Sequence, residues 1–95
     1  MRKIEKEMCA AVRERRNWRE SNTEVRRIEG GTRVYLYGNA IAAFLDDGTR
    51  YFSLAGWNTV TTRSRLNALG ARVGQRNWEP YFNGERIDTR KTYAF

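Results

Sequence analysis

The sequence contains no histidine and only one cysteine, Cys9. The lack of histidine excludes Ser–His–Asp triads, histidine acid–base catalysis and most zinc sites. A single cysteine cannot form an intramolecular disulfide or a CxxC motif, which fits a reducing compartment. Cys9 has no histidine to activate it, so we interpret it as a small packing residue. These absences predict a protein that is not an enzyme and uses no metal or cofactor.

Long apolar runs are also missing. No run approaches the ~18 residues that a membrane-spanning helix needs, and no signal-peptide core follows the charged N-terminus. We therefore expect no membrane partner and a cytoplasmic location. The chain has 95 residues, of which 40% are hydrophobic and 13% aromatic, enough for one modest core. We predict a single domain spanning residues 1–95.

Lysine is scarce, although the chain is basic. Only three of the 18 basic residues are lysines, and the formal net charge is +7. Arginine presents a planar fork that binds phosphate or carboxylate bidentately, so the bias favours an anionic partner. The excess charge lies in residues 1–20 and 61–95, whereas residues 21–60 are balanced. Long-range attraction to a polyanion would come from the two ends of the chain.

The N-terminal segment predicts a helix over residues 3–16, because apolar residues recur there with a helical period. Trp18 follows the helix, and we expect it to fold back as a lid on the core. Turn signals at Gly30-Gly31, Gly38-Asn39 and Asp46-Asp47-Gly48 then predict an antiparallel meander of about four strands. The expected strands are residues 23–29, 32–37, 40–45 and 49–54.

The C-terminal third predicts a short helix and a hairpin. Thr59, Thr61 or Thr62 can cap a helix that runs to Leu69, and Gly70 suits its left-handed end. Asn83-Gly84 is a strong hairpin signal between residues 78–82 and 85–87. Pro80 weakens the first of these strands or marks it as an edge. The tail, residues 92–95, ends in an aromatic residue and should dock on the body.

We therefore predict an α+β fold in which an N-terminal helix packs on an antiparallel β-meander, followed by a short helix and a C-terminal β-hairpin. The expected core residues are apolar and lie on one face of each element. They are Ile4, Met8, Val12, Val34, Leu36, Trp57, Leu66 and Leu69.

Two stretches, Val34–Ile41 (VYLYGNAI) and Ala55–Leu69 (AGWNTVTTRSRLNAL), resemble small, mostly uncharacterised accessory proteins of tailed bacteriophages. The resemblance spans about residues 21–87. It implies a phage protein that acts in the cytoplasm of a bacterial host cell, and it carries over no activity or binding residue.

The most suggestive candidate site lies between residues 61 and 76. Arginine, hydroxyl and amide side chains gather there at a helix start, where free backbone N–H groups attract anions. The alternative is a capped, solvated helix whose leucines pack inward. The candidate nucleic-acid-binding residues are Arg63, Ser64, Arg65, Asn67, Arg72 and Arg76.

A second candidate is the strand that carries Arg33, Tyr35 and Tyr37 on one face, with Tyr51 as a possible neighbour. Aromatic and arginine side chains on a sheet face can stack on unpaired bases. If this face instead meets the N-terminal helix, the tyrosines belong to the core, and the sequence does not decide between the two.

Other charged clusters have simpler interpretations. Asp46 and Asp47 fit turn chemistry, and the run from Arg13 to Arg19 fits a solvated helix end. Two functions remain open. The first is a small basic protein that binds DNA or RNA through arginine–phosphate contacts. The second is a protein that docks on a host protein through arginine and aromatic anchors. The oligomeric state stays open.

Overall fold

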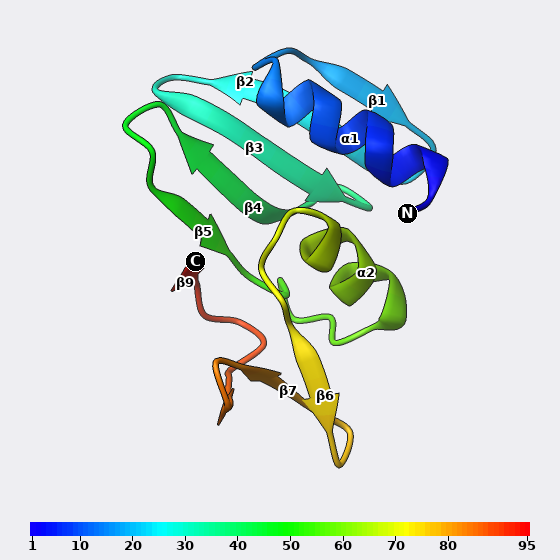
Figure 1. Ribbon diagram of the computed structural model, residues 1–95, viewed down its shortest axis with the longest axis vertical. Helices are drawn as coiled ribbons and strands as arrows, with labels where there is room; N and C mark the ends of the chain where they lie inside the picture. The colour runs from blue at the N-terminus through cyan, green and yellow to red at the C-terminus, as the bar shows by residue number, and fades with distance from the viewer.

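The computed structural model describes residues 1–95 and has two helices and two antiparallel sheets. Figure 1 shows their arrangement. Helix α1 spans Lys3–Arg13 and helix α2 spans Val60–Ala68. The large sheet has the strand order β1-β2-β3-β4-β5-β9. Its strands are β1 (Trp18–Glu20), β2 (Thr23–Ile28), β3 (Gly31–Leu36), β4 (Asn39–Leu45), β5 (Arg50–Phe52) and β9 (Tyr93–Ala94). The small sheet contains β6 (Gly74–Arg76), β7 (Glu79–Phe82) and β8 (Glu85–Arg86). The predicted α+β fold is confirmed.

Helix α1 ends at Arg13, three residues before the expected end. Arg15 has a left-handed φ of 54°, and its N–H donates to the Val12 carbonyl. The Arg16 N–H donates to the Ala11 carbonyl, which completes a Schellman-type end. Because the helix stops early, the chain has room for the unexpected strand β1. Trp18 lies in this strand and packs partly buried against the core.

The meander follows the predicted turns, with two shifts. Ile28 pairs with Gly31, so the β2–β3 turn is Glu29-Gly30 and not Gly30-Gly31. Leu36 pairs with Asn39, so the β3–β4 turn is Tyr37-Gly38 and not Gly38-Asn39. Both turn residues have positive φ, as a two-residue hairpin turn requires. The register of β3 and β4 also shifts between Val34 and Tyr35, which inserts an extra residue into β4.

In the C-terminal third, Thr59 is the cap of α2, and its side chain accepts a hydrogen bond from the Thr62 N–H. Gly70 has a φ of 100°, as expected for a left-handed helix end. Strand β7 is central in its sheet, so the expectation that Pro80 marks an edge is wrong. Proline is tolerated there because β8 pairs only with Tyr81 and Phe82.

The tail docks as predicted. Strand β9 pairs with β5, and the Phe95 ring packs edge-on against Phe52 and Phe44. Arg50 Nε donates to the Phe95 carbonyl at 3.1 Å. The tail therefore completes the large sheet.

Both helices lie on the same side of the large sheet. Helix α1 contacts β1, β2 and β3, while α2 contacts β4 and α1. Met8, Val34, Leu36 and Leu66 are buried as predicted. Ile4, Val12 and Leu69 are only half-buried, and Trp57 is 60% exposed, so its assignment to the core was wrong. The buried hydrophobic residues are Met8, Ala11, Val25, Val34, Leu36, Ile41, Ala42, Phe52, Leu54, Leu66, Ala71, Val73 and Ile87. Neither helix is long and apolar enough to cross a membrane.

Candidate nucleic-acid interface

Arg65, expected to contact phosphate, is buried between α1, α2 and β2. Its side chain is only 4% exposed. Its Nη1 donates to Glu5 Oε2 at 2.9 Å, and its Nε donates to Thr23 Oγ1 at 3.0 Å. Nη2 donates to Asn22 Oδ1. Because every nitrogen of the guanidinium is engaged inside the fold, we remove Arg65 from the predicted interface.

Ser64 and Asn67 also serve the fold. Ser64 Oγ donates to Glu5 Oε2, next to Arg65. Burial raises the pKa of Glu5, but the hydrogen bonds from Ser64 and Arg65 and the Arg65 charge outweigh it, so the pKa lies below its ordinary value. The Asn67 amide bonds both the N–H and the carbonyl of Val73, which fixes the loop after α2. Neither side chain is free to bind a phosphate.

The other arginines of this segment do not converge on one site. Arg63 Nη1 donates to Asn58 Oδ1 at 2.5 Å, at the start of α2. Arg72 is exposed with a left-handed φ of 56°. Arg76 is exposed on β6, and its guanidinium lies over the Tyr81 ring at 4.9 Å. The predicted cluster therefore separates into a buried network and individual surface arginines.

The face of the large sheet that points away from the helices, which we call the outer face, carries a different cluster. Strand register places Arg26 opposite Arg33, Arg33 opposite Ala43, and Ala43 opposite Tyr51. Two arginines directly opposite each other on neighbouring strands repel and destabilise a sheet. Arg26 is paired with Glu24 at 3.1 Å, but Arg33 has no carboxylate partner. The outer face thus holds an uncompensated cation.

Tyr35 lies on this outer face, because its neighbours Val34 and Leu36 point into the core. The interpretation of Tyr35 as core is therefore wrong. The Arg26 guanidinium lies over the Tyr35 ring at 4.6 Å, and Arg33 Nη1 donates to the Tyr35 hydroxyl at 3.3 Å. These contacts fix the positions of the Arg26 and Arg33 guanidinium groups relative to the Tyr35 ring.

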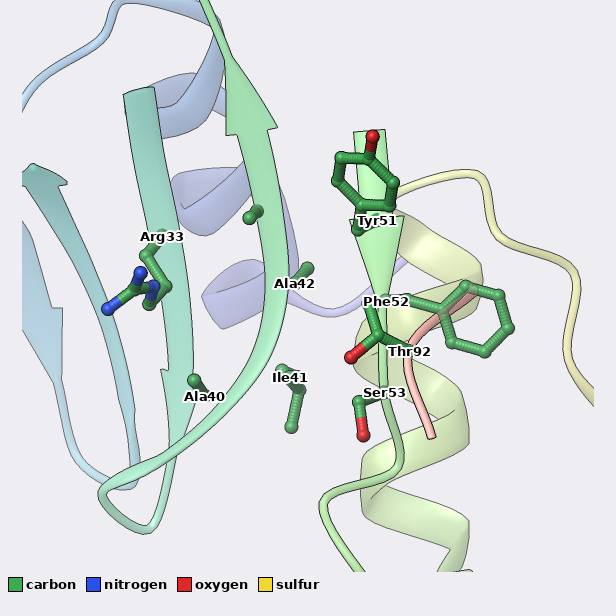
Figure 2. Close-up of a pocket in the computed structure, with 9 residues that line it drawn as sticks. Arg33, Ala40, Ile41, Ala42, Tyr51, Phe52, Ser53 and Thr92 are labelled. Atoms are coloured by element: carbon green, nitrogen blue, oxygen red, sulfur yellow. The ribbon is translucent and has the colours of Figure 1, made fainter. Parts of the chain in front are cut away.

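Beside this cluster the outer face is hollowed into a pocket of about 300 Å³. Figure 2 shows Arg33 on β3 and Tyr51 on β5, on opposite sides of β4. Ala40 and Ala43 of β4 supply small side chains between Arg33 and Tyr51. Ser53, which carries a hydroxyl group, follows Tyr51 along the same segment of the chain. The pocket has one cation, one exposed aromatic ring and an apolar floor, a combination that suits a flat, polar-edged group such as a nucleobase.

Tyr37 is separate from this pocket. It lies in the β3–β4 turn, is 72% exposed, and borders a second pocket of about 390 Å³ together with Trp57. Leu36, Ile41 and Leu54 form the apolar part of its lining. We call this the turn pocket.

Sequence reasoning did not select Arg26, although a usable signal was present. The two-residue turn Glu29-Gly30 pairs residues 23–28 with residues 31–36 and puts Arg26 on the face of Arg33 and Tyr35. A two-residue turn at the predicted Gly30-Gly31 would have put it on the same face. The sequence predicts Tyr51 only as a neighbour of this face, because the register of Tyr51 depends on the longer turn before β5.

The remaining clusters behave as turn and packing groups. The Asp46 carboxylate pairs with Arg27. Hydrogen bonds from Arg27 lower the pKa of Asp46. Asp47 accepts hydrogen bonds from the Thr49 N–H and hydroxyl, which lower its pKa. Cys9 is half-buried, with Sγ 3.3 Å from the Ala68 carbonyl, and burial raises its pKa. No group of three His, Cys, Asp or Glu side chains is placed to hold a metal ion.

A comparison with protein families matches the whole chain, residues 1–95, to the family described as Kyanoviridae Gp96 protein. Comparisons with curated proteins and with solved structures found no match. The match agrees with the resemblance to bacteriophage proteins seen in the sequence. The chain therefore belongs to the Kyanoviridae Gp96 protein family of phage proteins.

Proposed function

We propose that this phage accessory protein binds single-stranded DNA or RNA on the outer face of its large sheet. The observation that carries the proposal is the pair of opposed arginines, Arg26 and Arg33, beside the half-buried ring of Tyr35 and the exposed ring of Tyr51. A phosphate between the two guanidinium groups would relieve their repulsion. The tyrosines would stack on bases, a mode of binding that single-stranded nucleic acid permits and a duplex does not.

The charge of the outer face supports this choice. Three arginines point outward from β1, β2 and β3, against a single carboxylate, Glu24. The outward positions of β4 and β5 carry no charge, because they are occupied by alanines, Leu45 and Tyr51. The face thus joins a cationic half for phosphates to an apolar half for bases. The outward arginines are Arg19, Arg26 and Arg33.

The test is the salt dependence of binding to a labelled single-stranded oligonucleotide of mixed sequence, followed by fluorescence anisotropy. Each phosphate contact contributes about 0.7 to the log–log slope for single strands, so Arg26→Ala with Arg33→Ala should flatten the slope by about 1.4 units. The matched control replaces Arg13 and Arg90, which form no ion pair and lie off the outer face. It removes the same charge and should leave most of the slope unchanged.

A gain-of-affinity variant makes the test sharper. Glu24→Gln releases Arg26 from its ion pair and removes the only outward carboxylate, so binding should tighten. Equal losses in the outer-face and control variants would indicate attraction to net charge alone. Absence of binding to single- and double-stranded DNA and RNA at ~50 mM salt would exclude the proposed function, because electrostatic binding is strongest at low salt.

The turn pocket favours a second candidate, docking on a host protein. Its apolar lining lies between two exposed aromatic side chains, Tyr37 and Trp57, and aromatic residues dominate protein-interface hot spots. If this is the function, Trp57→Ala should abolish the capture of one host protein from nuclease-treated lysate. The Arg26 and Arg33 variant should retain that capture, which separates the two candidates.

A further inference from the structure

The hairpin formed by β6 and β7 extends beyond the helices and the large sheet (Figure 1). The strand register places Trp78 at its tip. Arg76 pairs with Glu79, so Asn77 and Trp78 are the two residues of the turn. Trp78 is 86% exposed and belongs to no hydrophobic cluster. Its ring therefore contributes nothing to the core.

The backbone at this tip is unfavourable for tryptophan. Asn77 and Trp78 have φ values of 51° and 67°, both left-handed. A two-residue turn of this kind favours Asn-Gly, and a bulky side chain rarely adopts such a conformation. The next hairpin, between β7 and β8, uses Asn83-Gly84 in an equivalent turn. The chain thus has the favoured residue in one turn and an exposed tryptophan in the other.

The hairpin is held in place instead of swinging freely. Asn58 Nδ2, at the start of α2, donates to Gln75 Oε1 at 3.2 Å and to the Trp78 carbonyl at 3.3 Å. Asn58 Oδ1 in turn accepts from Arg63. A braced hairpin presents its tip with less backbone left to order on binding.

The charge beside the tip indicates the partner. Glu79 pairs with Arg86 at 3.2 Å, so Arg76 has no carboxylate partner and lies over the Tyr81 ring. Gln75, Arg76, Asn77 and Glu79 around Trp78 are all exposed and polar. A protein hot spot is surrounded by further contacts that exclude water, whereas Trp78 projects from the tip among solvated polar side chains. An exposed ring two residues from an arginine that has no carboxylate partner instead suits a base and its neighbouring phosphate.

We propose that the β6–β7 hairpin is a second nucleic-acid contact, in which Trp78 stacks on an unpaired base and Arg76 binds a neighbouring phosphate. This rests on the proposed function, because it assigns the same ligand a contact outside the outer face. The two contacts would bind one strand at two separate places, which increases affinity without a larger single surface.

The test compares Trp78→Gly, Trp78→Phe and Arg76→Ala with wild type, using a labelled single-stranded oligonucleotide of about 16 nucleotides, the upper site size of small single-strand binders. Trp78→Gly should weaken binding about 5- to 150-fold, the loss of one stacked base, and should leave the salt slope unchanged. It should also keep or raise the melting temperature, because glycine suits the turn. Trp78→Phe should retain most of the affinity, and Arg76→Ala should flatten the slope by about 0.7.

Trp57→Phe is the matched control for the loss of an exposed tryptophan. Tryptophan emission should be quenched on binding in wild type and Trp57→Phe, and not in Trp78→Phe. If Trp78→Gly binds like wild type while the Arg26 and Arg33 variant is impaired, the hairpin proposal is overturned and the outer-face function stands. If wild type binds no nucleic acid, both fail. Loss of host-protein capture by Trp78→Gly with unchanged oligonucleotide binding would also overturn it, in favour of a protein partner.

Discussion

Glu5 and Arg65 form a buried ion pair that joins α1 to α2 over a separation of 60 residues, with Arg65 Nη1 2.9 Å from Glu5 Oε2. Both side chains are at most 5% exposed. Ser64 and Thr23 supply further hydrogen bonds, so no buried side-chain polar atom lacks a partner. A network of this kind fixes how α2 sits against α1 and β2, although its net contribution to stability is small.

Breaking this pair should destabilise the fold strongly. Arg65→Met leaves the Glu5 carboxylate buried without its counter-charge, which typically costs about 3–5 kcal/mol of the free energy of unfolding. Urea denaturation followed by circular dichroism measures the loss. The double variant Glu5→Leu with Arg65→Met should recover much of it, because no unpaired charge remains. An unchanged urea midpoint for Arg65→Met would contradict the role of the pair.

The same pair predicts how stability depends on pH. The pKa of Glu5 is lowered in the folded protein, so the unfolded chain binds this proton more readily. The stabilisation is therefore complete above the ordinary glutamate pKa of about 4.3, and is lost as the pH falls through the lower folded value. Thermal melts between neutral and acidic pH should show a smaller acid-induced decrease in Glu5→Gln than in wild type. Equal decreases would assign the acid sensitivity to Asp46, Asp47 and Glu14, whose pKa values are also lowered.

Leu36 and Trp57 were both expected in the core, and the structure separates them. Leu36 is 4% exposed and belongs to the buried core, so Leu36→Ala should cost about 2–5 kcal/mol of unfolding free energy. Trp57 is mostly exposed, and Trp57→Ala should cost far less. Parallel urea titrations of the two variants provide the comparison. A larger loss for Trp57→Ala would contradict the observed packing.

Local signals in the sequence predicted the elements well, because turns and caps depend on neighbouring residues. Gly70, the Thr59 cap and the Asn83-Gly84 turn all act within a few positions of the chain. The end of α1 was harder to predict for the same reason. The residue in the left-handed conformation there is Arg15, whereas the local signal for a helix end is glycine or asparagine.

Long-range contacts decided the candidate site, and no local pattern encodes them. Arg65 looked like a surface cation because its partner, Glu5, lies in another helix. Alternation along the strand shows which side chains share a face with Tyr35. It does not show which of the two faces packs against α1, so it does not decide whether Tyr35 is in the core. Arginine-rich composition therefore indicated an anionic ligand but not which arginines are free to reach it.

Cys9 should react slowly with thiol reagents. Burial raises its pKa, so little thiolate forms at neutral pH, and Sγ lies against the Ala68 carbonyl. Alkylation of the native protein, followed by mass spectrometry, should be much slower than in urea. Cys9→Ser should retain nucleic-acid binding, provided that circular dichroism shows a folded protein. Loss of all activity in a folded Cys9→Ser variant would contradict the prediction that the protein is not an enzyme.

The arginines of α2 should contribute less to salt-dependent binding than those of the outer face. Arg63 is hydrogen-bonded to Asn58, and Arg65 is buried inside the fold. Neither is therefore free to neutralise a phosphate and so release counterions from the nucleic acid. Arg63→Ala should therefore change the log–log salt slope by less than the ~0.7 units expected for one lost phosphate contact on a single strand. Arg33→Ala should give the full change, since Arg33 has no carboxylate partner on an open face. Arg33→Lys should keep the slope and lose affinity, because a point charge retains the ion pairing without the bidentate fork. If Arg63→Ala flattens the slope and Arg33→Ala does not, the nucleic acid binds at the start of α2 instead of on the sheet.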